Sequence, residues 1–151
     1  MKERIEKPAV YKIQPALYKS LAGLGEAAAA VLEPSLVHLV KLRASQMNGC
    51  AYCQHMHANE ARKDGEKQSR LDVLPAWREV PIFSARERAA FEWTEAVTRL
   101  SQTSPTDEEF AQLSEVFTQE EIVNLTITIA VINTWNRIAV SFNFFPDFKD
   151  L

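Results

Sequence analysis

The sequence predicts an all-α fold, and three observations support that prediction. Apolar residues recur at spacings of three and four over most of the chain, which is the period of a helix buried on one side. Three Ser/Thr-x-x-Glu motifs, the signature of a capping box, each precede an apolar stretch. The 4 glycines and 7 prolines fall mainly between the periodic segments. A chain of 151 residues can bury its own core, so we expect one domain over residues 1–151.

Three helices are expected in the first half of the chain, over residues 16–31, 35–47 and 50–63. Pro15 precedes the first, whose apolar stripe is Leu17, Leu21, Leu24 and Ala28. Glu33-Pro34 ends it and starts the second helix, because proline is favoured in a first turn. Asn48-Gly49 and Asp64-Gly65 are the stop signals of the second and third helices.

The second half predicts a short turn or helix at 68–72 and a linker that carries Pro75 and Pro81. Helices should follow over 84–100 and 106–117, each opened by a capping box. The last segment, 118–140, alternates apolar and polar residues from Val123 to Val131, which is strand periodicity. Its capping box and its lack of Gly and Pro favour a helix. Because this helix is apolar on nearly every side, we expect it to be largely buried, at the domain centre or in a subunit interface.

Composition and charge exclude several classes of function. The chain is 46% hydrophobic and 25% charged, and its net charge of -3 shows no basic excess, so we expect no nucleic-acid partner. The first eight residues lack the apolar segment of a secretion signal. The longest apolar run, 27–32, is far shorter than the ~18 residues of a membrane span. We therefore expect a cytoplasmic protein with no membrane association.

Residues 48–57 contain both cysteines and two of the three histidines. Cys50, Cys53 and His57 are spaced by three and four residues, so a helix would present them on one face, with Glu60 next on the same stripe. A thiolate at Cys50 would be stabilised by the helix N-terminus, whereas a thiol at Cys53 would lie beside the base His57. These two arguments favour different cysteines. Tyr52 and His55 should point away from the stripe.

Two cysteines this close in a reducing compartment indicate redox chemistry, metal binding or chance. One thiolate of such a pair can attack a peroxide or disulfide, and its neighbour can resolve the product as an internal disulfide. A structural zinc held by His38, Cys50, Cys53 and His57 is an alternative, although the spacing does not match a zinc finger. A thioredoxin-type pair would need a βαβ context, which the helical pattern does not supply.

The stretch from Leu39 to Cys53, followed by His57 and by residues 61–66, resembles the core of the alkylhydroperoxidase D family, within the wider carboxymuconolactone decarboxylase superfamily. The resemblance is dense over 34–66 and looser through 74–77, the helix after Ser84, and 132–137. The C-x-x-C-x-x-x-H motif after Ser-Gln-x-Asn-Gly carries it. The other branch of the superfamily decarboxylates a lactone and lacks the cysteine pair, so it is a poorer match.

The resemblance implies a helical fold assembled as a homo-oligomer, a trimer or hexamer, with thiol peroxidase or disulfide-reducing activity. We expect no cofactor. The resemblance also implies that Cys53 attacks a small hydroperoxide, that Cys50 resolves and faces the reductant, and that His57 relays protons. The implied reductant is a dihydrolipoyl protein or a similar dithiol. A non-enzymatic thiol switch that uses the same pair is the alternative from another class.

His38 departs from the family pattern, which commonly has Glu at this place as the far end of the proton relay. A second imidazole cannot raise the basicity of His57 as a carboxylate does, so we expect a weaker relay. Glu60 is a substitute carboxylate, although plain surface is the commoner role for such a residue. Core packing is expected for Trp93 and Trp135, with contact between Trp135 and the dithiol as the alternative. A solvated position is expected for His55 and Lys41, and the alternative for Lys41 is to hold an acid group of the substrate or the reductant.

Overall fold

The computed structural model describes residues 2–146 and 148, and the secondary structure of this part of the chain is entirely helical. Its α-helices in chain order are α1 (Lys7–Ile13), α2 (Ala22–Ala29), α3 (Pro34–Met47), α4 (Ala51–Lys63), α5 (Gln68–Val73), α6 (Ala85–Thr98), α7 (Asp107–Ser114) and α8 (Gln119–Phe142). A π-helical turn, η1 (Leu17–Leu21), precedes α2, and a 3-10 helix, η2 (Leu74–Glu79), follows α5. The all-α prediction is confirmed.

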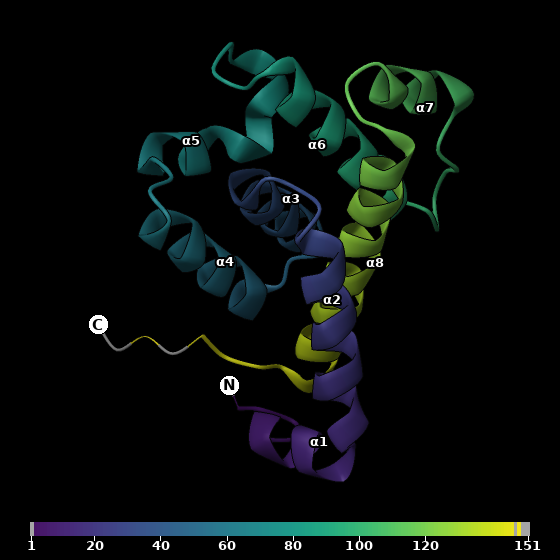
Figure 1. The fold of residues 1–151 in the computed structure, drawn as a ribbon. Coiled ribbons are helices and arrows are strands. Elements are labelled where there is room, and N and C mark those ends of the chain that lie inside the picture. Colours follow the sequence, from purple (N-terminus) through teal and green to yellow (C-terminus); the bar gives the residue numbers. More distant parts are fainter. Residues whose placement is uncertain (1, 147, 149–151) are drawn as a thin grey trace.

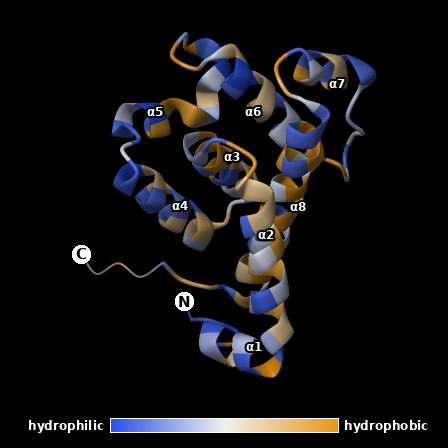
Figure 2. Ribbon diagram, in the orientation of Figure 1, coloured by the Kyte–Doolittle hydropathy of each residue, from blue (hydrophilic) through white to orange (hydrophobic). Residues whose placement is uncertain are grey.

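Helix α3 is the centre of the domain. It packs against α4, α6 and α8, while α2 lies along α8 (Figure 1). Figure 2 shows hydrophobic colours concentrated along α8 and hydrophilic colours over most of α4. Residues of α3, α6, α7 and α8 form one apolar cluster, and a second cluster joins α3 to α4, α5 and η2. Within the described residues, no helix is long and apolar enough to cross a membrane.

The predicted helices at 35–47 and 50–63 correspond closely to α3 and α4, but the prediction for 16–31 was only partly right. This segment is divided into η1 and α2, and Leu24 of the predicted stripe is half exposed. Helix α1 was not predicted, because it is short and buries only Val10. Residues 74–79, expected as a linker, form η2, in which Leu74 and Trp77 are buried.

All three predicted capping boxes are present. Ser84, Thr106 and Thr118 each accept a hydrogen bond from a backbone N–H three residues on, and the glutamate there bonds back to the cap. The last of these boxes starts α8, which settles the strand-like pattern in favour of a helix of 24 residues. The expectation that this helix is largely buried was only partly right, since nine of its 24 residues are buried whereas Val123 and Val140 are about half exposed.

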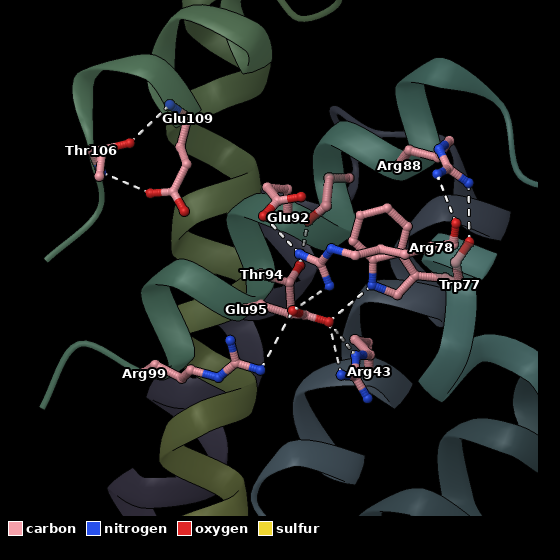
Figure 3. Close-up of polar contacts among 11 residues, drawn as sticks. Arg43, Trp77, Arg78, Arg88, Glu92, Thr94, Glu95, Arg99, Thr106 and Glu109 are labelled. Carbon is pink, nitrogen blue, oxygen red and sulfur yellow. Dashed lines mark hydrogen bonds and ion pairs between the residues drawn. The ribbon is translucent and has the colours of Figure 1, made fainter. Parts of the chain in front are cut away.

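A buried carboxylate ties α6 to α3 and η2 (Figure 3). Glu95 accepts hydrogen bonds from Arg43 Nε at 2.9 Å, Trp77 Nε1 at 2.9 Å and Arg78 at 2.8 Å, and its side chain is 2% exposed. Burial raises the pKa of Glu95, but its three donors outweigh that effect and the net pKa is lowered. Glu95 therefore remains ionised and holds three elements in register.

The two ends of the described chain meet beside the cysteines. The backbone N–H of Arg4 donates to the Phe142 carbonyl at 2.9 Å, and the Arg4 guanidinium donates to the Ser141 carbonyl at 2.8 Å. Val10 of α1 and Phe144 pack in one apolar cluster with Cys50 and Cys53. The terminal segments thus cover the start of α4.

Candidate active site

Cys50 occupies the N-cap of α4, as the sequence predicted. Gly49 supplies the left-handed turn that ends α3, with φ +63, a conformation that side chains disfavour. The Cys50 backbone then donates to the Ser45 carbonyl at 3.0 Å, which closes the turn. The Cys50 sulfur accepts the Cys53 backbone N–H at 3.3 Å, in the place where a cap oxygen usually stands.

A buried amide network fixes this turn to α8. The Asn48 side-chain amide donates to the side-chain oxygens of Asn133 at 3.0 Å and Asn136 at 2.9 Å. Asn136 in turn donates to the Ser45 hydroxyl at 3.0 Å. The Ser-Gln-x-Asn-Gly segment before the cysteines thus has a physical role, because Ser45, Asn48 and Gly49 each hold the turn in place.

The cysteines are joined as a disulfide, with their Cα atoms 5.4 Å apart. Both are buried, at 1% exposure for Cys50 and 2% for Cys53. A cavity of about 430 Å³ lies beside them, and Cys53 and His57 line it whereas Cys50 does not. Aromatic side chains form much of its wall, namely Tyr11, Tyr18, Tyr52, Trp135 and Phe144. An apolar ligand in this cavity would therefore lie against Cys53.

His57 is 5% exposed and is held at one ring nitrogen by a carboxylate. Its Nδ1 lies 2.8 Å from Glu60 Oε2, while its buried Nε2 has no hydrogen-bond partner among the described residues. Desolvation lowers the pKa of His57, and the bond to Glu60 opposes that shift. The bond to His57 is the main cause that lowers the pKa of Glu60. A neutral ring whose Nδ1–H is donated to Glu60 presents Nε2 as a base.

His38 does not meet His57 by a hydrogen bond. Its Nε2 lies 2.6 Å from Asp64 Oδ2, just beyond the end of α4, and His38 does not line the cavity. The carboxylate beside His57 is Glu60, so the interpretation of Glu60 as plain surface was wrong. Any influence of His38 on the relay is electrostatic and acts through space, and its catalytic role stays a prediction.

Five further side chains test the sequence-based expectations. Tyr52 and Trp135 were expected away from the site or in the core, but both line the cavity, and Lys41 lines it as well instead of a solvated face. His55 does not line it and bonds to Asn59 at 3.0 Å, as expected of a residue outside the site. Trp93 is 9% exposed within the core, as predicted.

The described residues contain no group of three or more His, Cys, Asp or Glu side chains placed to hold a metal ion. His38, proposed as a fourth zinc ligand, is paired with Asp64 instead. The zinc alternative therefore gains no support from this geometry.

Replacing Glu60 by Gln should lower the basicity of His57. Without the carboxylate, the pKa of His57 falls further below its ordinary value, because the one group that raises it most is gone. The neutral, basic form of His57 then persists to lower pH. The acidic limb of the pH profile of thiol oxidation should move to lower pH, while the maximal rate falls by roughly tenfold.

The measurement is the rate of Cys53 oxidation by peroxide at several pH values. Glu115→Gln, which removes an exposed carboxylate that does not line the cavity, is the matched control. An unshifted acidic limb in Glu60→Gln would show that Glu60 does not tune His57.

The fold and the site define a helical protein with a C-x-x-C disulfide at the start of a helix. The model of the Carboxymuconolactone decarboxylase family matches residues 15–96, which is more than half of the chain. The chain belongs to that family, and within it the chain is alkylhydroperoxidase D-like, as the sequence resemblance indicated.

Individual relatives agree with this assignment. The uncharacterised protein YdfG of Bacillus subtilis (strain 168) is 42% identical over 103 residues, which cover 68% of this chain and 70% of YdfG. A protein of unknown function from Agrobacterium tumefaciens, suggested to be an AhpD antioxidant defence protein, superposes with a TM-score of 0.90 at 40% identity over 97% of this chain and 99% of its own. The debrominase Bmp8 shares the fold, with a TM-score of 0.76 at 18% identity over 90% of this chain and 74% of that chain.

Proposed function

We propose that this protein reduces hydroperoxides through a dithiol–disulfide cycle of Cys50 and Cys53. The observation that carries the proposal is the shared cavity of Cys53 and His57, in which His57 Nε2 is free to accept a proton and Nδ1 is held by Glu60. The likeness to the Agrobacterium protein supports the same chemistry.

In the reduced protein, His57 Nε2 takes the proton of the Cys53 thiol. The thiolate attacks the terminal oxygen of the hydroperoxide, and the O–O bond breaks, so that Cys53 becomes a sulfenic acid and an alcohol leaves after protonation. Cys50 then attacks the sulfur of Cys53, which releases water and forms the disulfide. The substrate gains two electrons and the dithiol loses two.

The position of Cys50 supports its proposed role as the resolving thiol. Its sulfur lies at the helix N-terminus and accepts the Cys53 N–H, and both features stabilise a thiolate at neutral pH. Resolution by a neighbour one helical turn away needs no movement of a second domain. We propose that a dihydrolipoyl group or a similar dithiol then reduces the disulfide, and that the protein works as a homo-oligomer.

The aromatic cavity favours organic hydroperoxides over hydrogen peroxide. Burial of an alkyl or aryl group against its apolar wall contributes to the binding free energy, whereas a small polar oxidant gains little from that contact. We expect kcat/KM for cumene hydroperoxide to exceed that for hydrogen peroxide.

The test is peroxide consumption by the purified protein with each of several reductants, dihydrolipoamide among them. Continuous turnover with a dithiol supports the proposal. If peroxide oxidises the cysteine pair but no dithiol supports repeated turnover, the result would instead support a thiol switch. If the reduced thiols react with none of the hydroperoxides, the proposed peroxidase activity is refuted.

A further inference from the structure

Lys41 is a cationic side chain at the reaction cavity that the dithiol mechanism leaves unused. It lies on α3, it is half-buried, and it lines the cavity with Cys53 and His57. Its backbone carbonyl accepts a bond from the Ser45 hydroxyl at 2.8 Å, and its side-chain ammonium has no hydrogen bond or ion pair with any described residue. An unpartnered ammonium on the wall of the cavity that Cys53 also lines is available to a ligand.

The other ammonium of the cavity is already occupied. Lys7 Nζ donates to the Tyr52 hydroxyl at 3.0 Å and lies 4.7 Å from the centre of that ring. The hydrogen bond to Tyr52 is the main cause that raises the pKa of Lys7, which makes it a weaker acid. Burial likewise raises the pKa of Tyr11.

Lys41 has no such hydrogen bond to raise its pKa, and burial is the largest influence on it. Desolvation lowers its pKa, and the nearby carboxylates of Glu60 and Glu26 oppose that shift. The negative charges of Glu60 and Glu26 offset part of the positive charge of Lys41. A ligand group with a permanent negative charge is therefore disfavoured here. A group that receives negative charge only during the reaction suits this environment better.

We propose that Lys41 is the general acid that protonates the oxygen leaving from the hydroperoxide, a role that rests on the peroxidase proposed above. When the Cys53 thiolate takes the terminal oxygen, the O–O electron pair passes to the other oxygen. Lys41 Nζ gives that oxygen a proton, so an alcohol leaves in place of an alkoxide. Lys41 recovers a proton from solvent, and the thiol proton held by His57 returns to solvent.

The apolar walls of the cavity increase the effect that a proton donor has on the reaction rate. An alkoxide developing among aromatic side chains would lack the solvation it has in water. Transfer of a proton during O–O cleavage removes that charge, and general acids of this kind contribute about 10²- to 10⁴-fold to rates. His57 supplies the base for the thiol, so Lys41 and His57 would act at opposite ends of the reacting O–O bond.

The test varies the leaving group and the residue together. Pre-reduced wild type, Lys41→Met and Lys41→Arg are each mixed with tert-butyl hydroperoxide or with peracetic acid, and the single-turnover rate of thiol oxidation is measured. An alkoxide needs a proton to leave, whereas acetate leaves readily without one. Both variants should lose about 10²-fold with the hydroperoxide and keep the wild-type rate with the peracid within roughly threefold. Lys63→Met, which removes an exposed lysine of α4, should resemble wild type with both oxidants.

Other outcomes overturn the proposal. Equal losses with both oxidants would assign Lys41 a structural role, and a wild-type rate in Lys41→Arg would show that charge alone is needed. If wild type reacts with hydroperoxides but the variants keep its preference between the oxidants, only the role of Lys41 falls. If wild type reacts with neither oxidant, both the proposed peroxidase activity and the proposed role of Lys41 are refuted.

Discussion

Cys53→Ser should abolish reaction with hydroperoxides, whereas Cys50→Ser should still react once and then stop. Cys53 lines the cavity and Cys50 does not, so only the Cys53 sulfur meets a ligand held there. A serine hydroxyl is not a nucleophile toward peroxide at neutral pH, so the expected loss in Cys53→Ser is at least about 10³-fold. In Cys50→Ser the sulfenic acid forms but lacks its resolving partner.

Mass spectrometry after a single exposure to peroxide distinguishes the two variants. Cys50→Ser should gain one oxygen on Cys53 and react with a sulfenic-acid probe, and its peroxide turnover with dithiol should be lost or slow. Cys53→Ser should gain neither. A sulfenic acid on Cys50 of Cys53→Ser, formed at the rate of wild type, would reverse the roles of the two sulfurs.

The same geometry bears on the reductive half of the cycle. Cys50 was expected to face the reductant, yet it is 1% exposed and lies outside the cavity lining. A dithiol that enters the cavity meets Cys53 first, and Cys50 would then leave as the thiolate stabilised at the N-terminus of α4. The cysteine found in a trapped mixed disulfide with dihydrolipoamide decides which sulfur the reductant attacks.

Local signals predicted most of the fold. Each of the three capping boxes marks the first turn of a helix in the structure, and Gly49 marks a true helix end, because caps and left-handed turns depend on neighbours in sequence. Helix α1 and the turn η1 could not be predicted in this way. These two elements fold against the distant segment around Phe142 and Phe144, and sequence periodicity does not report such a long-range contact.

In the candidate site too, local features could be predicted from the sequence and tertiary contacts could not. The shared face of Cys50, Cys53 and His57 follows from helical spacing alone. The position of Glu60 on that stripe was visible too, but its bond to His57 depends on how deeply His57 is buried, which α3 and α4 determine together. Trp135 and Lys41 lie on other helices, so only tertiary structure could assign them to the cavity.

Glu95→Ala should cause the largest loss of stability of any single change considered. Glu95 is 2% exposed and accepts bonds from Arg43, Trp77 and Arg78. Its removal leaves the largely buried Arg43 and Trp77 without this acceptor, while the half-exposed Arg78 keeps its pair with Glu92. Breaking one side of a buried ion pair costs about 3–5 kcal/mol. For a domain of this size, that corresponds to a fall in Tm of roughly 10–15 °C.

Glu92→Ala is the matched control, because Glu92 pairs with the same Arg78 on the surface, where its side chain is 34% exposed. Its cost should be within about 1 kcal/mol. The ionised form of Glu95 is favoured in the fold, so wild type should lose this stabilisation as pH falls through the lowered pKa of Glu95, while Glu95→Ala should lack that part of the acid sensitivity. Urea unfolding at neutral and acidic pH measures both effects. Equal stabilities of Glu95→Ala and Glu92→Ala at neutral pH would mean that the buried network is not what holds α6 to α3 and η2.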